Sequence, residues 1–337
     1  MRDILDLLNS GKTLSESQMA EAMTQIMDGL CSEDDIALFL TLLSKRGETV
    51  DEITGAAKIL RARAETIEAP PGTLDCCGTG GDASGTYNVS TAVGLVVAAC
   101  GISVAKHGNR AASSKSGAAD VLETLGVNLD MPHKALERSL EKLNFCFLMA
   151  PHHHKAMKHV SAVRKKLGFK TIFNLLGPLA NPAGADFQLV GVYDKKWLIP
   201  MAETLKNLGS KGAWVVHGSD GLDEITVTGA TYVAALRDGN IIEKTIIPAD
   251  FGLDISQSAD LQGGDPAHNA KALREILNGK KSAYRDIVIA NAAAALCLYG
   301  TISTLKEGAQ LAGEVLDSGA ANALLNEYIS FSKGKKA

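Results

Sequence analysis

A glycine-rich segment followed by amide and hydroxyl side chains is the clearest chemical signal in the sequence. Gly78-Thr-Gly-Gly-Asp82 comes directly after an apolar run, and Asn88-Val-Ser-Thr91 opens an expected helix. Glycine lets backbone N–H groups approach a ligand, and a helix N-terminus presents donors to an anion. The pattern also satisfies a relaxed dinucleotide fingerprint, but it lacks the acidic residue expected about 20 positions later, and it is not a Walker loop. We predict a phosphate-binding loop rather than a simple strand–helix turn.

A second loop of the same character follows. Lys106-His-Gly-Asn-Arg110 comes after another apolar run, and Ser116-Gly117 precedes an expected helix. From residue 83 to residue 119 the chain has no Asp or Glu, although its 38 acidic residues outnumber its 34 basic ones. Such a stretch suits a polyanion better than a solvated surface. A serine-rich surface loop is the alternative for this segment alone, but beside the first loop it indicates a second phosphate group.

Two adjacent carboxylates, Asp223 and Glu224, end the segment Gly218-Ser-Asp-Gly-Leu-Asp-Glu. Neighbouring side chains on a strand face opposite sides of the sheet, so both carboxylates can serve one site only from a loop. Gly218 and Gly221 favour such a loop. Carboxylates beside a pyrophosphate indicate Mg²⁺ held partly by protein and partly by substrate oxygens. An ordinary acidic turn is the alternative.

Two basic segments invite other interpretations. Pro151-His-His-His154 suggests a metal site, but no tetrahedral set with a carboxylate or thiolate partner is evident, so we do not favour it. Arg164, Lys165 and Lys166 stand near an expected helix C-terminus, where such a run is usually a solvated face favoured by the helix dipole. A single inward-facing Arg could instead hold a carboxylate through two hydrogen bonds.

Composition limits the class of protein. A length of 337 residues predicts about two domains. The net charge of −4 argues against a nucleic-acid-binding surface over the whole chain. Six cysteines without a CxxC pair indicate reduced thiols. The longest apolar runs fall well short of the roughly 20 residues of a membrane-spanning helix, and acids near Met1 argue against a secretory signal. We therefore expect a cytoplasmic protein without a membrane partner.

The elements that position these residues divide the chain. Residues 1–67 read as short helices, because Ser15, Ser32 and Thr49 are each followed three residues later by Gln, Asp or Glu, as in helix N-caps. After Pro70-Pro71-Gly72, short apolar strands alternate with alanine-rich helices, which predicts a parallel sheet covered by helices. The strand candidates are Thr73–Cys77, Ile102–Ala105, Phe145–Leu148, Phe187–Val192 and Ala213–His217.

The expected fold is thus α/β, with a small all-helical domain and a large α/β domain around a mainly parallel sheet. The helical domain covers residues 1–67 and is completed by two helices within about 155–183. The α/β domain covers residues 73–154 and 184–332, and residues 333–337 form a disordered tail. Spare apolar surface on the helical domain would suit a dimer interface.

In order along the chain, these segments resemble the anthranilate phosphoribosyltransferases, the tryptophan-pathway enzymes of the nucleoside phosphorylase-like phosphoribosyltransferase family. The resemblance covers essentially the whole chain. Besides the two glycine loops and the acidic segment, it rests on Met157-Lys-His-Val-x-x-Val-Arg164 and Phe173-Asn-Leu-Leu-Gly-Pro-Leu179. It implies a homodimer formed through the helical domains and a substrate cleft between the domains. It also implies transfer of the phosphoribosyl group of phosphoribosyl pyrophosphate (PRPP) to the amine of anthranilate.

The resemblance also implies roles for individual residues, with Lys106, Asn109 and Arg164 as positioning groups. The PRPP site would contain Gly78, Gly81, Asp82, Thr86, Asn88, Val89, Ser90, Thr91, Lys106, His107, Gly108, Asn109, Arg110, Ala111, Ala112, Ser113, Ser114 and Ala118. Anthranilate would meet Gly78, His107, Asn109, Arg164 and Pro178, and Ser90, Asp223 and Glu224 would organise two Mg²⁺ ions. Ala118 and Lys155 depart from the small polar residue and the proline that the family often has there.

The chemistry of the residues agrees with this interpretation. Loss of pyrophosphate leaves positive charge on the sugar and negative charge on the leaving group, which Mg²⁺ and Lys106 would stabilise. An aromatic amine is neutral at pH 7, so its attack needs orientation more than deprotonation. We name no obligatory general base, and His107 stays open as a proton acceptor.

Two other functions fit parts of the pattern. A pyrimidine nucleoside phosphorylase would share the architecture and the phosphate loops, but it would differ on the acceptor side, where Asn109 and Arg164 stand here. A non-catalytic nucleic-acid-binding relative would keep the fold alone. The acidic balance and the presence of Asp223 and Glu224 disfavour it, and we expect no nucleic-acid partner.

Overall fold

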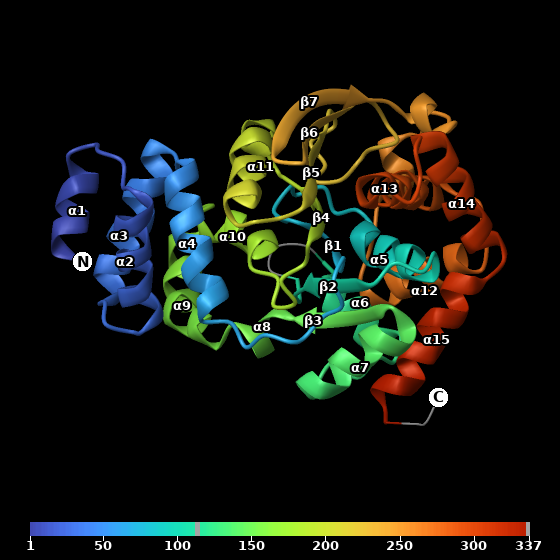
Figure 1. Ribbon diagram of the computed structural model, residues 1–337, viewed down its shortest axis with the longest axis horizontal. Helices are drawn as coiled ribbons and strands as arrows, with labels where there is room; N and C mark the ends of the chain where they lie inside the picture. The colour runs from blue at the N-terminus through green and yellow to red at the C-terminus, as the bar shows by residue number, and fades with distance from the viewer. Residues whose placement is uncertain (112–114, 335–337) are drawn as a thin grey trace.

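The computed structural model describes residues 1–111 and 115–334. A group of helices at the N-terminal end lies beside a larger body built around a sheet, and the two termini lie far apart (Figure 1). The strands are β1 Leu74–Gly78, β2 Val104–Gly108, β3 Phe145–Met149, β4 Phe187–Gly191, β5 Gly212–Gly218, β6 Thr231–Arg237 and β7 Asn240–Ile246.

Helices make up most of the remaining chain. The α-helices are α1 Arg2–Asn9, α2 Glu16–Met27, α3 Glu33–Arg46, α4 Val50–Ala62, α5 Val89–Ala99, α6 Ala118–Thr124, α7 His133–Leu143, α8 Ala150–His153, α9 Lys158–Leu167, α10 Phe173–Leu179, α11 Leu198–Asn207, α12 Pro266–Leu277, α13 Ala283–Tyr299, α14 Leu305–Asp317 and α15 Ala320–Ser332. Four 3₁₀ turns are η1 Lys155–Met157, η2 Lys195–Trp197, η3 Pro248–Phe251 and η4 Ser258–Leu261. No helix of the described segments is long and apolar enough to cross a membrane.

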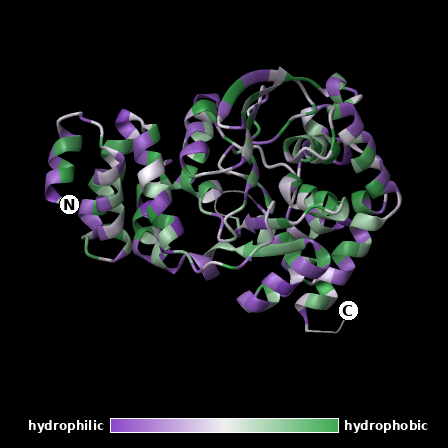
Figure 2. Ribbon diagram, in the orientation of Figure 1, coloured by the Kyte–Doolittle hydropathy of each residue, from purple (hydrophilic) through white to green (hydrophobic). Residues whose placement is uncertain are grey.

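The expected N-caps begin the helices of the N-terminal group. The Ser15 and Thr49 side chains accept from the N–H groups of Gln18 and Glu52, which complete capping boxes at α2 and α4. Ser32 caps α3 in the same way through Asp35. Each of these helices buries only some of its residues. Hydrophobic and hydrophilic residues accordingly mix along the helices at the N-terminal end, seen as green and purple turns (Figure 2). Local sequence signals therefore set where this part of the fold begins.

The sheet is mainly parallel, as the sequence predicts. Its strand order is β3-β2-β1-β4-β5-β6-β7, and β3 to β5 run parallel. The five expected strands are present within a few residues. Strands β6 and β7 were not predicted, and they extend the sheet in antiparallel fashion. β7 is an edge strand whose residues are mostly exposed, so it lacks the continuous apolar run that marks a buried strand.

One face of the sheet shares its core with the N-terminal helices. Val190 and Val215 belong to the same apolar cluster as the buried residues of α2–α4 and α9, whereas their neighbours Leu189 and Trp214 face the cluster around α5 and α13. Helix α9 packs on α2 and α3, and α10 packs on α4. Because the helical group and the sheet share this core, their packing does not define a boundary between two domains. The domain boundaries stay a prediction. Residues 335–337 of the predicted disordered tail lie outside the described residues.

Candidate active site

The acidic loop meets the first glycine loop at the carboxyl ends of the central strands. Asp223 lies after β5, and its Oδ2 accepts a hydrogen bond from the Gly80 N–H at 2.7 Å. A Cβ atom on Gly78 would stand 2.3 Å from the same oxygen, and one on Gly191 would stand 1.5 Å from the Asp223 carbonyl. Both positions therefore require glycine. The contact joins segments 143 residues apart and confirms that residues 223–224 lie on a loop.

Three carboxylates gather there. Burial and the nearby Asp82 raise the pKa of Asp223, and burial together with Asp223 raises the pKa of Glu224. The Lys106 ammonium and the Ser90 backbone amide partly offset the shift at Glu224. Carboxylate oxygens that repel one another are suitable ligands for a hard divalent cation. Within residues 1–111 and 115–334 no group of three His, Cys, Asp or Glu side chains is placed to hold a metal ion without other ligands.

A buried acid, Asp75, lies near Lys106, and its role could not be predicted from the sequence. The Lys106 side chain is 2% exposed, and its Nζ donates to the His107 carbonyl at 3.1 Å. Asp75, fully buried in β1, accepts from the His107 N–H at 3.1 Å. Burial raises the pKa of Asp75, and the Lys106 charge lowers it. A carboxylate inside an otherwise apolar strand was the only sequence signal for this support.

The second loop folds back on itself. The Asp120 carboxylate accepts from the N–H groups of Ala111 and Gly117, each at 2.9 Å. A Cβ atom on Gly117 would stand 2.3 Å from the Ala111 nitrogen. The Arg110 guanidinium pairs with Asp120 at 3.1 Å and with Glu123 at 2.7 Å, so here it contacts acids rather than the glycine loop. Ala112, Ser113 and Ser114 lie outside the described residues.

The two loops are joined directly. Asn88 precedes α5, and its Nδ2 donates to the Ser116 carbonyl at 3.1 Å. Thr86 forms an isolated bridge with Gln262. Thr91 is fully buried, and its hydroxyl has no hydrogen-bond partner among the described residues. The remaining candidates of the two loops, Gly81, Val89, Gly108 and Ala118, lie in or beside these elements.

Helix α10 connects the residues predicted to meet anthranilate. The Arg164 guanidinium, on α9, lies 5.4 Å from the centre of the Phe173 ring, and burial lowers its pKa. No carboxylate in the described chain forms an ion pair with it. At the other end of α10, Pro178 is buried and the Gly177 backbone interacts with His107. Asn109 is exposed, and its Oδ1 accepts from the Arg110 N–H at 2.8 Å.

His107 is a neutral ring. Burial, with further contributions from His154 and Lys106, lowers its pKa to about 3. Its Nε2 is buried and has no hydrogen-bond partner among the described residues. A ring with this pKa is a weak base, so the geometry favours a hydrogen-bond acceptor over a proton acceptor.

The histidine run does not form a metal site in the described chain. The His154 ring lies 5.3 Å from the His107 ring, and the His153 ring stacks on His133 at 4.8 Å. Nδ1–H of His153 donates to the Glu65 carbonyl at 2.6 Å. These rings form a packed row where the chain passes between the helical group and the sheet.

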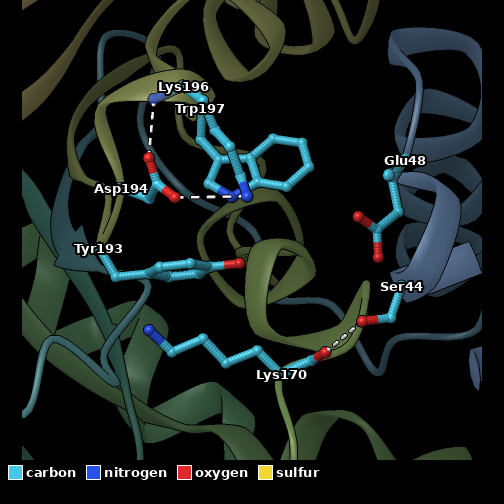
Figure 3. A pocket seen from close by; sticks show the side chains of 8 residues that line it. Ser44, Glu48, Lys170, Tyr193, Asp194, Lys196 and Trp197 are labelled. Carbon is cyan, nitrogen blue, oxygen red and sulfur yellow. Dashed lines mark hydrogen bonds and ion pairs between the residues drawn. The ribbon is translucent and has the colours of Figure 1, made fainter.

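A cavity of about 300 Å³ lies between the helical group and the sheet, next to the first glycine loop (Figure 3). Its lining residues are Ser44, Gly47, Glu48, Lys170, Tyr193, Asp194, Lys196 and Trp197. The Lys170 ammonium lies 3.7 Å from the centre of the Tyr193 ring, and the Tyr193 N–H donates to the Thr79 hydroxyl at 3.1 Å. The Lys170 carbonyl accepts from Ser44 of α3 at 3.0 Å. This cavity borders the glycine loop but contains neither Asp223 nor Glu224.

The sequence matches two models of one family. Residues 2–64 match the helical bundle domain of the glycosyl transferase family, and residues 70–322 match its a/b domain. The chain is 53% identical to the anthranilate phosphoribosyltransferase of Rhodospirillum rubrum, over 98% of this chain and 95% of that protein. It is also 53% identical to the Azospirillum brasilense enzyme of the same name, over 98% and 93%.

Solved structures agree along the full length. The crystal structure of anthranilate phosphoribosyltransferase from Thermus thermophilus superposes with a TM-score of 0.93 at 43% identity, covering 98% of this chain and 99% of that one. The Saccharomyces cerevisiae enzyme in complex with PRPP and Mg gives a TM-score of 0.91 at 30% identity, covering 98% and 97%. The yeast enzyme in complex with 4-fluoroanthranilate gives 0.89 at 28% identity, covering 99% and 98%.

Proposed function

The chain belongs to the glycosyl transferase family and, within it, to the anthranilate phosphoribosyltransferases, and from this membership we propose how its residues carry out the reaction. The enzyme transfers the phosphoribosyl group of PRPP to the amine of anthranilate in tryptophan biosynthesis, giving N-(5-phosphoribosyl)anthranilate and pyrophosphate. The observation that carries the proposal is the hydrogen bond from Gly80 to Asp223, which unites the phosphate loop with the acidic loop.

The two glycine loops are proposed to hold PRPP. Backbone N–H groups of Gly81 and Asp82 would meet its phosphates, because the N–H groups of Thr79 and Gly80 already bond Gly191 and Asp223. The start of α5 would add the donors of a helix N-terminus. Thr91 supports this, since its buried hydroxyl has no partner among the described residues. Lys106 would add positive charge to the pyrophosphate side, with its ammonium held by the His107 carbonyl. Arg110 would join the site only by leaving Asp120 and Glu123.

The enzyme uses Mg²⁺, and we propose that two ions occupy the site during turnover. Asp223, Glu224 and Ser90 would hold them, with Asp82 nearby. When bound, Mg²⁺ neutralises charge on the leaving pyrophosphate. The neighbouring carboxylates, whose pKa values burial and mutual repulsion raise, favour this arrangement because a divalent cation would relieve their repulsion.

The acceptor would lie along α10. Arg164 is half-buried and has no acidic partner in the described chain, so it can hold the anthranilate carboxylate. His107 would accept a hydrogen bond at Nε2, and Asn109, Gly177 and Pro178 would line the path of the substrate. The lone pair of the amine forms the bond to C1 of the ribose, the C1–O electrons leave with pyrophosphate, and the nitrogen releases a proton. Orientation rather than deprotonation drives this attack.

Anthranilate fluorescence tests the function directly. Fluorescence should fall when PRPP and Mg²⁺ are both present and stay constant when either is omitted. Cleavage of a pyrimidine nucleoside that depends on phosphate would indicate a nucleoside phosphorylase instead. DNA binding that weakens with salt, without turnover, would indicate a nucleic-acid-binding relative. The homodimer and the cytoplasmic location stay predictions.

A further inference from the structure

Two amide side chains, one buried and one half-buried, connect helix α12 to both phosphate loops. Asn269 of α12 is 2% exposed, and its Oδ1 accepts from the Gly264 N–H at 2.8 Å. Its Nδ2 donates to Oδ1 of Asn88 at 2.9 Å. Nδ2 of Asn88 in turn donates to the Ser116 carbonyl at 3.1 Å. A row of three hydrogen bonds therefore runs from Gly264 through the side chains of Asn269 and Asn88 to the second loop.

Backbone groups fix the direction of this row at both ends. The Gly264 N–H can only donate, so the oxygen of Asn269 must face it and the NH₂ group must face Asn88. The Ser116 carbonyl can only accept, so the NH₂ group of Asn88 must face it. Turning either amide over would set oxygen against oxygen or N–H against N–H. The orientation of Asn88 is thus determined by a residue 181 positions away.

We propose that Asn269 is a positioning residue that fixes the Asn88 amide for PRPP binding. The inference rests on the proposed PRPP site. One N–H of the Asn88 NH₂ group bonds Ser116, and the other has no partner among the described residues. It is therefore free to donate to a phosphate oxygen beside the first turn of α5. An amide turned the other way would present its oxygen to the anion, and it would also lose its bond to the second loop.

The substitution Asn269→Asp isolates this role. Aspartate still accepts from Gly264 but cannot donate to Asn88, so the Asn88 amide must turn. We expect the KM for PRPP to rise about tenfold or more, as loss of a hydrogen bond to a charged group predicts, while the KM for anthranilate changes less than about twofold. The matched control is Asn322→Asp, which removes the donor of another amide pair, to Asn278, on α15. It should leave both KM values unchanged.

A double-mutant cycle separates orientation from the added negative charge. If Asn269 acts through Asn88, then Asn269→Asp should have little further effect on the KM for PRPP in an Asn88→Ala background. An equal effect in both backgrounds would mean that charge or general packing is responsible, and it would overturn the inference. If Asn269→Asp does not fold, the uncharged Asn269→Ser enters the same cycle with the same two outcomes.

The wild-type enzyme distinguishes this inference from the proposed function. A wild-type protein that does not consume anthranilate contradicts the proposed function. An active wild type with an unchanged KM for PRPP in the folded Asn269→Asp variant contradicts only the positioning role.

Discussion

Several charged side chains of the site are buried without enough opposite charge around them to neutralise them. Asp223 and Glu224 repel one another and Asp82, and Lys106 is the basic side chain that offsets Glu224. Arg164 presents the opposite case, a half-buried cation over the Phe173 ring. A buried charge without a partner lowers the stability of the folded protein, so we expect Asp223, Glu224 and Arg164 to be most stable when a ligand of opposite charge is bound.

The double change Asp223→Asn with Glu224→Gln should lower turnover about 100-fold or more, because the charge that holds Mg²⁺ is lost. The Mg²⁺ concentration that gives half-maximal rate should rise as well. Initial rates over a Mg²⁺ titration measure both. Asp220→Asn is the control in the same loop. The Asp220 carboxylate accepts from Thr226 and Thr228, so its loss should reduce stability without changing the Mg²⁺ dependence. Unchanged rates of the double variant at limiting Mg²⁺ would contradict the metal role.

Arg164→Ala should raise the KM for anthranilate about 10- to 100-fold, because the substrate carboxylate loses a charged partner in a half-buried site. The KM for PRPP should change little. Lys165→Ala, one residue along the same helix but exposed, is the control. Should the KM for PRPP increase instead, Arg164 would have to be assigned to the PRPP side of the site.

At the level of elements, short segments connect the site to its support. α10 places Phe173 under Arg164 at one end and Gly177 beside His107 at the other. His154, directly after α8, lies 5.3 Å from the His107 ring, and His153, the last residue of α8, bonds Glu65 in the chain that leaves α4. These histidines are neutral in the folded protein because burial lowers their pKa values, to about 4 for His153. The stability of the packing around His153 and His154 should therefore depend on pH.

Stability should fall as the pH decreases from about 6.5 towards 4, because the unfolded chain binds a proton at His153 before the folded chain does. His153→Gln keeps an N–H donor for the Glu65 carbonyl but does not titrate. We expect this variant to lose about 2 kcal/mol less unfolding free energy than the wild type between pH 7.5 and pH 5. Urea unfolding at the two pH values measures the difference.

His152→Gln is the control for this measurement, since the His152 side chain is 41% exposed. It should lose as much stability as the wild type. Equal losses in all three proteins would show that His153 does not titrate as its burial indicates.

For the whole molecule, the helical group and the sheet meet around the glycine loop. At the cavity between them, Ser44 of α3 donates to the Lys170 carbonyl (Figure 3). The Tyr193 N–H, from another lining residue, donates to the Thr79 hydroxyl of the glycine loop. The position of the helical group is thereby connected to the PRPP site. Two large apolar residues of this group are exposed, Leu30 to 74% and Leu38 to 44%. Such residues fit the proposed homodimer interface.

The double change Leu30→Asp with Leu38→Asp should convert a dimer to a monomer, because two buried charges would be unpaired in the interface. Light scattering measures the mass in solution. Ile255→Asp is the control, since Ile255 is also 74% exposed but lies between η3 and η4, outside the helical group. A mass that stays the same in the double variant would place the interface elsewhere, and a monomeric wild type would exclude the dimer.

Local features could be predicted from the sequence: helix starts at Ser15, Ser32 and Thr49, the five parallel strands, and the two glycine-containing loops that follow β1 and β2. Caps, periodicity and glycine turns are encoded within a few residues, so they can be read without a structure. Parallel strands also end at one edge of the sheet, which made the convergence of the loops predictable.

The supporting residues, in contrast, become evident only in the folded protein. Asp75 matters because it accepts from the His107 backbone next to Lys106, Gly191 because the Asp223 backbone passes over it, and Asn269 because it faces Asn88. Nothing in the local sequence distinguishes these residues from any other buried acid, strand glycine or helical asparagine. Their roles arise from contacts between segments far apart in the chain, and such contacts exist only once the sheet and its helices have packed.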